Sequence, residues 1–349
     1  MNDERKLSRA ARVHRWLKNV ASAAKTRRQA VKKRSLHGVN EHSEPVANAG
    51  LASAAVFRLP VKWLVSGPPL LFLLLLVAIP SVIMVIASFR YPGEFGGLAP
   101  LIAADPQILH GLTIETYQFF FSDFIYTEVF LKSFAMALAT TIICLVMAYP
   151  LAMLIARSPK KSRNLMMLLV ILPFTTNFLI GIYAWMIILG PQAALNHVVN
   201  VVLGLFGIAP VQLLFSPFAV LIAMVYVYLP FMVLPLYTNL EKHDPVLLDA
   251  AQDLGANAWQ RFWRVTFPLS QPGIFAGAAL VFIPAIGMFA VPELLGGTGD
   301  IMIGNLIKEQ FLGTRDWPFG STLAILLTLA VLAVVWLVAK LSARGGRYA

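Results

Sequence analysis

The chain has 349 residues, of which 58% are hydrophobic and 13% are charged, and its mean hydropathy is +0.73. A soluble domain of this length could not bury so much apolar surface, so the composition excludes a soluble globular protein and predicts an integral membrane protein. The net charge of +11 does not indicate nucleic-acid binding, because the basic residues gather beside the ends of the apolar runs.

The N-terminal segment is basic: residues 1–62 contain fourteen of the twenty-eight Lys and Arg residues. Residues 1–50 have few large apolar side chains, so we expect a poorly ordered cytoplasmic tail. Either the tail binds anionic lipid head groups, or it only fixes the orientation of the first span. The first apolar run begins after a polar stretch too long for a signal peptide, so it predicts a retained membrane anchor.

Apolar runs long enough to cross about 30 Å of hydrocarbon as helices recur along the rest of the chain. We place six of them, at 67–90, 130–156, 165–190, 213–239, 271–292 and 321–342. The predicted fold class is therefore all-α, a polytopic domain of six transmembrane helices over residues 63–343. Lys and Arg gather again at 157–163, at 242–264 and after the last run, which places both termini, including a short tail at 344–349, in the cytoplasm.

Two segments between the runs are expected on the outer side. Residues 91–129 combine acidic side chains with an aromatic cluster, which is either a landing surface for an external partner or a set of interfacial anchors for the second span. The cluster consists of Tyr117, Phe119, Phe120, Phe121, Phe124 and Tyr126. Residues 191–210 contain an apolar stripe with helical spacing that is too short to cross a membrane, so they predict an interfacial helix.

Prolines within the runs predict bent helices, because the carbonyl groups that they free must be satisfied by neighbouring helices or in water-lined cavities. These are Pro150, Pro173, Pro230, Pro235 and Pro284.

Other chemistry is not indicated. The single cysteine, Cys144, lies within a span, and His197 and His243 are isolated, so no metal site is expected. The glycines of 296–299 lack the Lys-Ser/Thr of a phosphate loop, and no grouping of residues suggests catalysis.

A polar loop at 241–268 separates the fourth and fifth runs. Asp244 and Pro245 have the residue types that start a helix, and Gly255 is the type that ends one. Between them, apolar side chains with helical spacing share one face. Asn257 then opens a second short helix that contains Trp259 and Trp263. We interpret the loop as a helix–turn–helix that docks another protein.

The spacing within this loop resembles the cytoplasmic signature of the membrane-spanning subunits of binding-protein-dependent ABC importers. That signature is Glu-Ala-Ala, three residues, Gly, nine residues, then Ile-x-Leu-Pro. Here it departs by Asp for Glu, Val for Ile and Phe for Leu, and the resemblance extends over about residues 60–342. The matching residues are Asp249, Ala250, Ala251, Gly255, Val265, Phe267 and Pro268.

The resemblance implies a type I importer permease in the bacterial inner membrane, which switches between inward- and outward-facing states. In that family the loop inserts into a groove of a cytoplasmic ATPase dimer. The seven residues would then couple the pore to the ATPase. ATP and Mg²⁺ would be bound by that partner, and no cofactor by this chain.

The C-terminal third narrows the resemblance to spermidine/putrescine permeases. The similar stretches are 282–284, 291–297, 302–307 and 314–320. This implies a second homologous permease, an extracytoplasmic solute-binding protein, membrane lipid as surroundings and no nucleic acid. The alternatives are a permease for another organic cation or small metabolite, an ion-coupled secondary transporter, and a membrane-embedded enzyme. An ion-coupled transporter would need ionisable residues in several spans and a duplicated half, and the spans show neither. A membrane-embedded enzyme would need converging catalytic groups, and the spans lack these too.

A path for polyamines needs carboxylates or carbonyls for the ammonium groups and aromatic faces for cation–π contact. Glu293 is the one acid near membrane depth, and its alternative role is that of a solvated interfacial residue. Aromatic residues in spans three to five are the other candidates, with lipid contact or helix packing as their alternative roles. They are Tyr183, Trp185, Tyr226, Tyr228 and Phe289.

Overall fold

The structure is a computed structural model that describes residues 61–102 and 111–345. The predicted basic tail and the last residues of the chain lie outside the described ranges. Within them the chain forms helices, turns and two isolated β-bridges, with no strand.

The helices, in chain order, are α2 (Val61–Ser88), α3 (Glu115–Ser122), α4 (Phe124–Arg157), α5 (Lys160–Thr175), α6 (Phe178–Leu189), α7 (Ala194–Leu205), α8 (Pro217–Leu240), α9 (Pro245–Asp253), α10 (Ala258–Arg261), the π-helical turn η1 (Phe262–Thr266), α11 (Phe267–Ile286), α12 (Ala290–Leu295), α13 (Ile303–Lys308), the π-helical turn η2 (Glu309–Gly313) and α14 (Trp317–Gly345).

The membrane-spanning segments agree with the six predicted runs. Five helices in the described ranges are long and apolar enough to cross, over Ser66–Ser88, Phe124–Arg157, Pro217–Leu240, Ala258–Ile286 and Trp317–Val338. The third predicted run, 165–190, corresponds to the pair of α5 and α6, which is bent by 90°; the number of spans is six when this pair is counted as one. Extended backbone at Thr176 and Asn177 makes the bend, and the Asn177 side chain accepts a hydrogen bond from the Leu179 amide, so a new helix begins there.

The fifth span differs from its prediction at both ends. Its helix begins at Ala258, because α10, η1 and α11 are continuous, and it ends at Ile286. The second helix of the 241–268 loop is therefore the start of a span, and the prediction of a short separate helix is wrong. Asn257 caps this start, and hydrogen bonds through η1 allow the helix to continue.

The core lies where α4, α8 and α11 pack together. Small buried residues at helical spacing on α4, among them Ala137, Cys144 and Ala148, allow close approach of the neighbouring helices. On α11, a Cβ atom at Gly273 would lie 2.7 Å from the Asn239 Cβ of α8, and one at Gly277 would lie 2.7 Å from the Met232 sulfur. Glycine is thus required where α8 and α11 meet.

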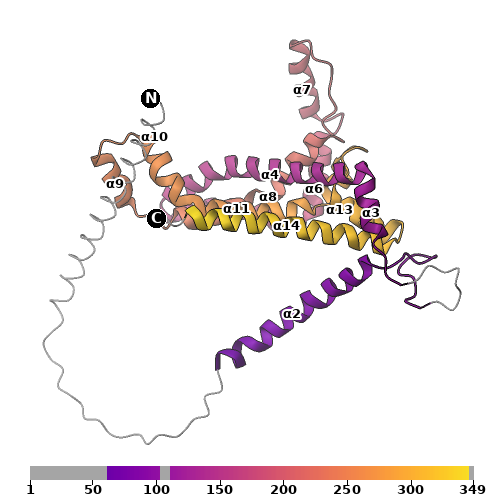
Figure 1. The fold of residues 1–349 in the computed structure, drawn as a ribbon. Coiled ribbons are helices and arrows are strands. Elements are labelled where there is room, and N and C mark those ends of the chain that lie inside the picture. Colours follow the sequence, from indigo (N-terminus) through magenta and orange to yellow (C-terminus); the bar gives the residue numbers. More distant parts are fainter. Residues whose placement is uncertain (1–60, 103–110, 346–349) are drawn as a thin grey trace, which may run out of the picture.

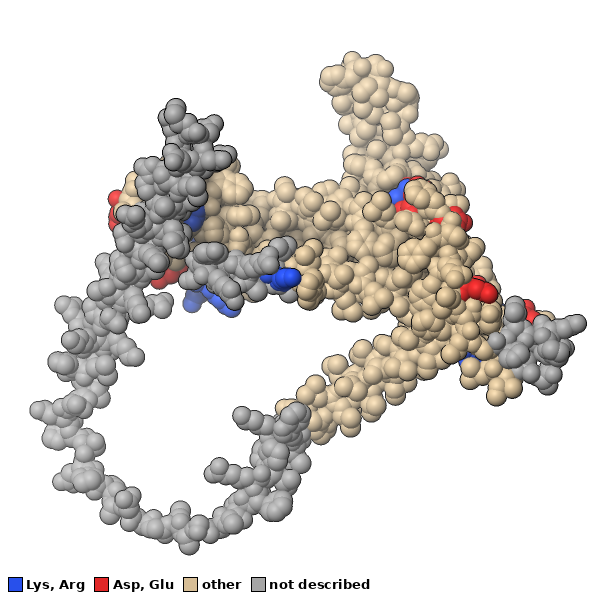
Figure 2. Space-filling model, in the orientation of Figure 1, with Lys and Arg blue, Asp and Glu red and all other residues tan. Residues whose placement is uncertain are grey.

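The two ends of the bundle differ. Figure 1 shows α9 and α10 at one end, α3 and α13 at the other, and α7 projecting sideways near the second end. At that second end a small buried cluster of Phe120, Ile303, Phe319 and Leu323 joins α3 and α13 to α14. Charged side chains on the face drawn in Figure 2 gather at the two ends, and the length of the bundle between them is nearly free of charge.

Helix α2 is joined to the bundle mainly through its C-terminal end. The Ser88 carbonyl accepts a hydrogen bond from the Thr116 hydroxyl at 3.0 Å, and the Ser88 hydroxyl pairs with Tyr117 at 2.9 Å. The rest of α2 diverges from the bundle, and its apolar side chains are exposed (Figure 1).

Candidate functional site

The 241–268 loop begins with a closed helical hairpin. The Asp244 carboxylate accepts from the Val246 amide at 3.0 Å and starts α9, as predicted. At the other end, Gly255 has a φ of +80°, and the amides of Gly255 and Ala256 donate to the carbonyls of Gln252 and Ala251 at 2.8 and 3.0 Å. This is the Schellman arrangement, in which glycine adopts the left-handed conformation without strain.

The second half of the hairpin is held by its own cap. Asn257 and Gln260 form a capping box with distances of 2.8 and 3.2 Å. Arg261 then donates to the Gln252 side chain at 2.6 Å, which ties α10 to α9.

The predicted coupling residues differ in exposure, and Gly255 is exposed whereas Val265 and Phe267 are partly exposed. Asp249 and Pro268 are exposed, and Ala250 is partly exposed. Ala251 is only 1% exposed, so its small side chain serves the packing of the hairpin itself. Leu254 and Trp259, at 56% and 69% exposure, add exposed apolar side chains to the same hairpin.

Aromatic packing links the loop to α4. The Tyr149 ring on α4 packs edge-on against Phe262 at 5.5 Å, and Phe267 lies beside both. The Tyr149 hydroxyl pairs with the Ser270 hydroxyl of α11 at 2.9 Å. These contacts join the base of the loop to two of the three core helices, α4 and α11.

A second contact at this end of the bundle connects two polar loops that the distribution of Lys and Arg places on the same side of the membrane. Arg163, at the start of α5, forms an ion pair with Glu241, at the end of α8, at 2.6 Å. The structure thus brings together the loops after the second and fourth predicted runs.

Glu293 lies toward the opposite end and has a partner. Lys308 on α13 donates to its carboxylate at 2.5 Å, and the Lys308 ammonium lies 5.7 Å from the centre of the Phe289 ring. The structure therefore brings together two of the predicted path residues, Glu293 and Phe289, around a lysine that the sequence reasoning did not identify. The one available signal was that Lys308 is the only basic residue between Arg264 and Arg315.

The remaining path candidates lie on α6 and α8. Trp185 on α6 and Tyr226 on α8 pack edge-on at 5.8 Å. Tyr228 is 4% exposed and belongs to the core, whereas Tyr183 is 49% exposed. The structure does not gather the six candidates into one surface of this chain.

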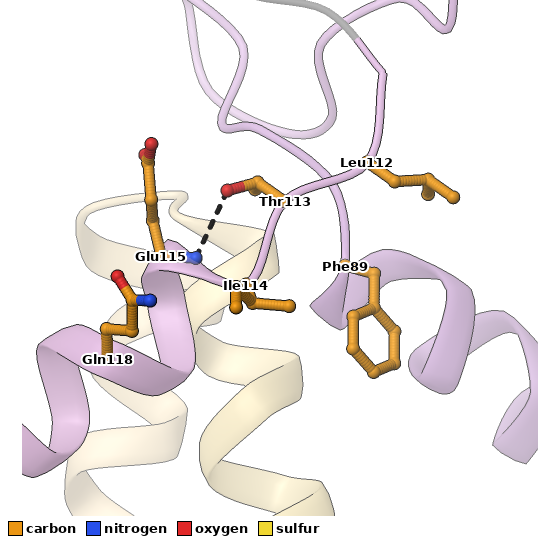
Figure 3. Close-up of a pocket in the computed structure, with 6 residues that line it drawn as sticks. All are labelled: Phe89, Leu112, Thr113, Ile114, Glu115 and Gln118. Atoms are coloured by element: carbon orange, nitrogen blue, oxygen red, sulfur yellow. Dashed lines mark hydrogen bonds between the residues drawn. The ribbon is translucent and has the colours of Figure 1, made fainter.

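A hollow of about 430 Å³ lies elsewhere, where α2 ends and α3 begins. Its lining residues are Phe89, Leu112, Thr113, Ile114, Glu115 and Gln118. Figure 3 shows the Glu115 and Gln118 side chains on the same side of α3, and the Thr113 hydroxyl accepts from the Glu115 amide at 3.1 Å.

Phe119 and Tyr126 of the predicted outer aromatic cluster pack against Phe319 of α14, so much of that cluster has an internal role.

The described residues contain no group of three or more His, Cys, Asp and Glu side chains suited to a metal ion.

Comparison with known proteins decides the family. Residues 148–345, which include the hairpin and the Glu293 region, match the family described as binding-protein-dependent transport system inner membrane component. The chain belongs to this family.

Two curated relatives of this permease are particularly similar. It is 47% identical to the spermidine/putrescine transport system permease protein PotB of Escherichia coli (strain K12) over 222 residues, which are 63% of this chain and 80% of PotB. It is 30% identical to the inner membrane ABC transporter permease protein YdcU of the same organism, over 62% of this chain and 72% of YdcU.

The fold agrees with these relationships. The permease matches a chain of the bacterial alginate ABC transporter, crystallised with an alginate pentasaccharide-bound periplasmic protein, with a TM-score of 0.62 and 18% identity. The match covers 82% of this chain and 98% of the other. The chain is thus a multi-pass permease with the fold of an ABC transporter membrane subunit, as the sequence predicted.

Proposed function

We propose that this permease is half of the pore of an ATP-driven importer for polyamines such as spermidine and putrescine. The observation that carries the proposal is the 47% identity to a spermidine/putrescine permease over 80% of its length. The carboxylate and aromatic face of Glu293 and Phe289 support it, because these are the groups that recognise an ammonium ion.

The proposed complex contains a second, homologous permease, an external solute-binding protein and a cytoplasmic ATPase dimer. The 241–268 hairpin lies on the cytoplasmic side in this proposal, because the basic residues around it favour that side. Its exposed Asp249, Leu254 and Trp259 provide the surface that contacts the ATPase. Closure of the ATPases on ATP then shifts the pore between its inward- and outward-facing states.

The test is uptake by the complete complex in proteoliposomes. The permease is expressed with its partner subunits, purified in mild detergent and reconstituted with the solute-binding protein. Radiolabelled putrescine, spermidine and an amino acid are then supplied in competition. ATP-dependent accumulation of the polyamines, blocked by each other and not by the amino acid, is expected.

Two other outcomes would contradict the proposal. Accumulation of a different solute in preference to polyamines would show that the substrate is not a polyamine, but the assignment as an ATP-driven importer would stand. Transport by the permease without an ATPase, driven by an ion gradient, would overturn the importer itself.

A further inference from the structure

Lys308 places an ammonium group, at the end of an alkyl stem, on the groups that a polyamine would use. Its ammonium contacts the Glu293 carboxylate at 2.5 Å and lies over the Phe289 ring at 5.7 Å. Among the ion pairs of the described residues, this is the one whose ammonium also faces an aromatic ring. The Lys308 ammonium thus lies between a carboxylate and an aromatic ring, the two kinds of group that bind an ammonium ion.

The backbone around this site is broken and held in place. Helix α11 ends at Ile286 and α12 begins at Ala290, so the intervening residues are not helical. The Asn305 side chain donates to the Phe289 carbonyl at 2.8 Å, and the Gly304 backbone packs against Gly287. Non-helical backbone at membrane depth is tolerated where protein buries it or where it lines a water-filled cavity.

The ion pair is open to exchange. The side chains of Lys308 and Glu293 are 35% and 43% exposed on the surface of this chain, and an ion pair that faces water to that extent is weak. The lysine stem is long and flexible, so it can leave the carboxylate without movement of α13. A second ammonium ion that reaches Glu293 can therefore compete with Lys308 for the same two groups.

We propose that Glu293 and Phe289 form an ammonium-binding subsite of the permease, that Lys308 occupies it in the absence of substrate, and that one ammonium group of the polyamine displaces Lys308. The inference rests on the proposed function, because it names the part of this chain that contacts the substrate.

Competition makes the two partners of the ion pair respond in opposite directions. Lys308→Gln removes the competitor, so putrescine should bind about two- to five-fold more tightly, in line with the small stability of exposed ion pairs. Glu293→Gln removes the acceptor of a charge-assisted hydrogen bond, so binding should weaken about ten-fold or more. A purely structural ion pair would instead give weaker binding in both variants.

The experiment measures equilibrium binding of radiolabelled putrescine to the complete importer in lipid nanodiscs, without the solute-binding protein. Lys132→Gln is the matched control, because it removes the lysine of an exposed ion pair on α4 that has no aromatic partner. It should leave the affinity unchanged. Phe289→Leu keeps an apolar side chain and should weaken binding about two- to five-fold. Unlabelled 1,4-butanediol, which has no ammonium group, should not compete.

The outcomes separate the two proposals. If the wild-type complex binds putrescine but Lys308→Gln and Glu293→Gln shift the affinity in the same direction, or neither shifts it, the subsite is refuted and the importer remains. If the wild-type complex binds no putrescine but takes it up with the solute-binding protein, the subsite is refuted and the importer remains; if it neither binds nor takes up putrescine, the proposed substrate is refuted as well. Thermal melting of each complex identifies a variant that has lost its fold, and the Phe289→Leu result then decides the question.

Discussion

The turn at Gly255 is the most direct point at which to test the 241–268 hairpin. Its φ of +80° is a left-handed conformation, and a Cβ atom there would meet nothing within 4 Å. Gly255→Val therefore acts through backbone strain alone. An L-residue in this conformation costs about 1–2 kcal/mol, and a β-branched residue is at the upper end. The ratio of closed to open turn should fall about five- to thirty-fold.

Gly207→Val is the matched control for this substitution. Gly207 follows α7, has a φ of +70° and likewise has no atom within 4 Å of a Cβ position. Both variants are reconstituted as complete importers, and ATP hydrolysis and putrescine uptake are measured together. Gly255→Val should lower uptake in proportion to the lost turn, while the amount of membrane-inserted permease stays the same. Gly207→Val should transport normally.

Equal uptake and equal stimulation of ATP hydrolysis in the wild type and in Gly255→Val would refute the coupling role of the hairpin. Equal losses in the two variants would show that strain at any exposed turn impairs this protein, and would remove the reason to single out Gly255.

Three further changes test the packing behind the hairpin. Tyr149→Phe removes the hydroxyl that pairs with Ser270, so the complex should lose about 1 kcal/mol of stability, read as a lower melting temperature. Ser270→Ala in the same background should cost only what the Ser270 bond to the Phe267 carbonyl contributes. Gly273→Ala forces a Cβ to 2.7 Å from α8 and should cost about 1–3 kcal/mol, whereas Gly204→Ala in α7 has open space and should be tolerated. Burial lowers the pKa of His243, so on acidification the unfolded chain binds a proton before the folded chain does. The melting temperature of the complex should therefore fall as the pH drops below about 6.5. His243→Asn should make the melting temperature less dependent on pH.

The spans could be predicted from sequence because hydropathy over about 20 residues depends on composition and not on neighbours. Pro173 predicted a bend in the third run, but neither the 90° size of the bend between α5 and α6 nor its position at Thr176 and Asn177 was predicted. A proline can interrupt a helix or leave it continuous, as Pro150 does within α4. Which of the two occurs depends on packing against other helices, which cannot be read from the local sequence.

The hairpin was predicted in more detail than the substrate path. Caps and turns depend on residues three to five positions apart, so Asp244, Gly255 and Asn257 could each be assigned a role that the structure confirms. The contact of Glu293 with Lys308 joins residues on separate helices, and its formation depends on the break after Ile286. No short-range rule predicts such a contact.

The continuity of the fifth span limits how this molecule can move. From Ala258 to Ile286 the chain is one helix of 29 residues, about 43 Å long at the usual rise per residue. One end of this helix lies in the exposed hairpin, and the other stops at the break before Phe289. A force applied to α10 is not lost in a flexible loop, because no loop intervenes. Within the helix, the π-helical turn η1 and Pro272 are the points at which it can bend, and the first residues that are not helical are the three between Ile286 and Ala290, just before Glu293.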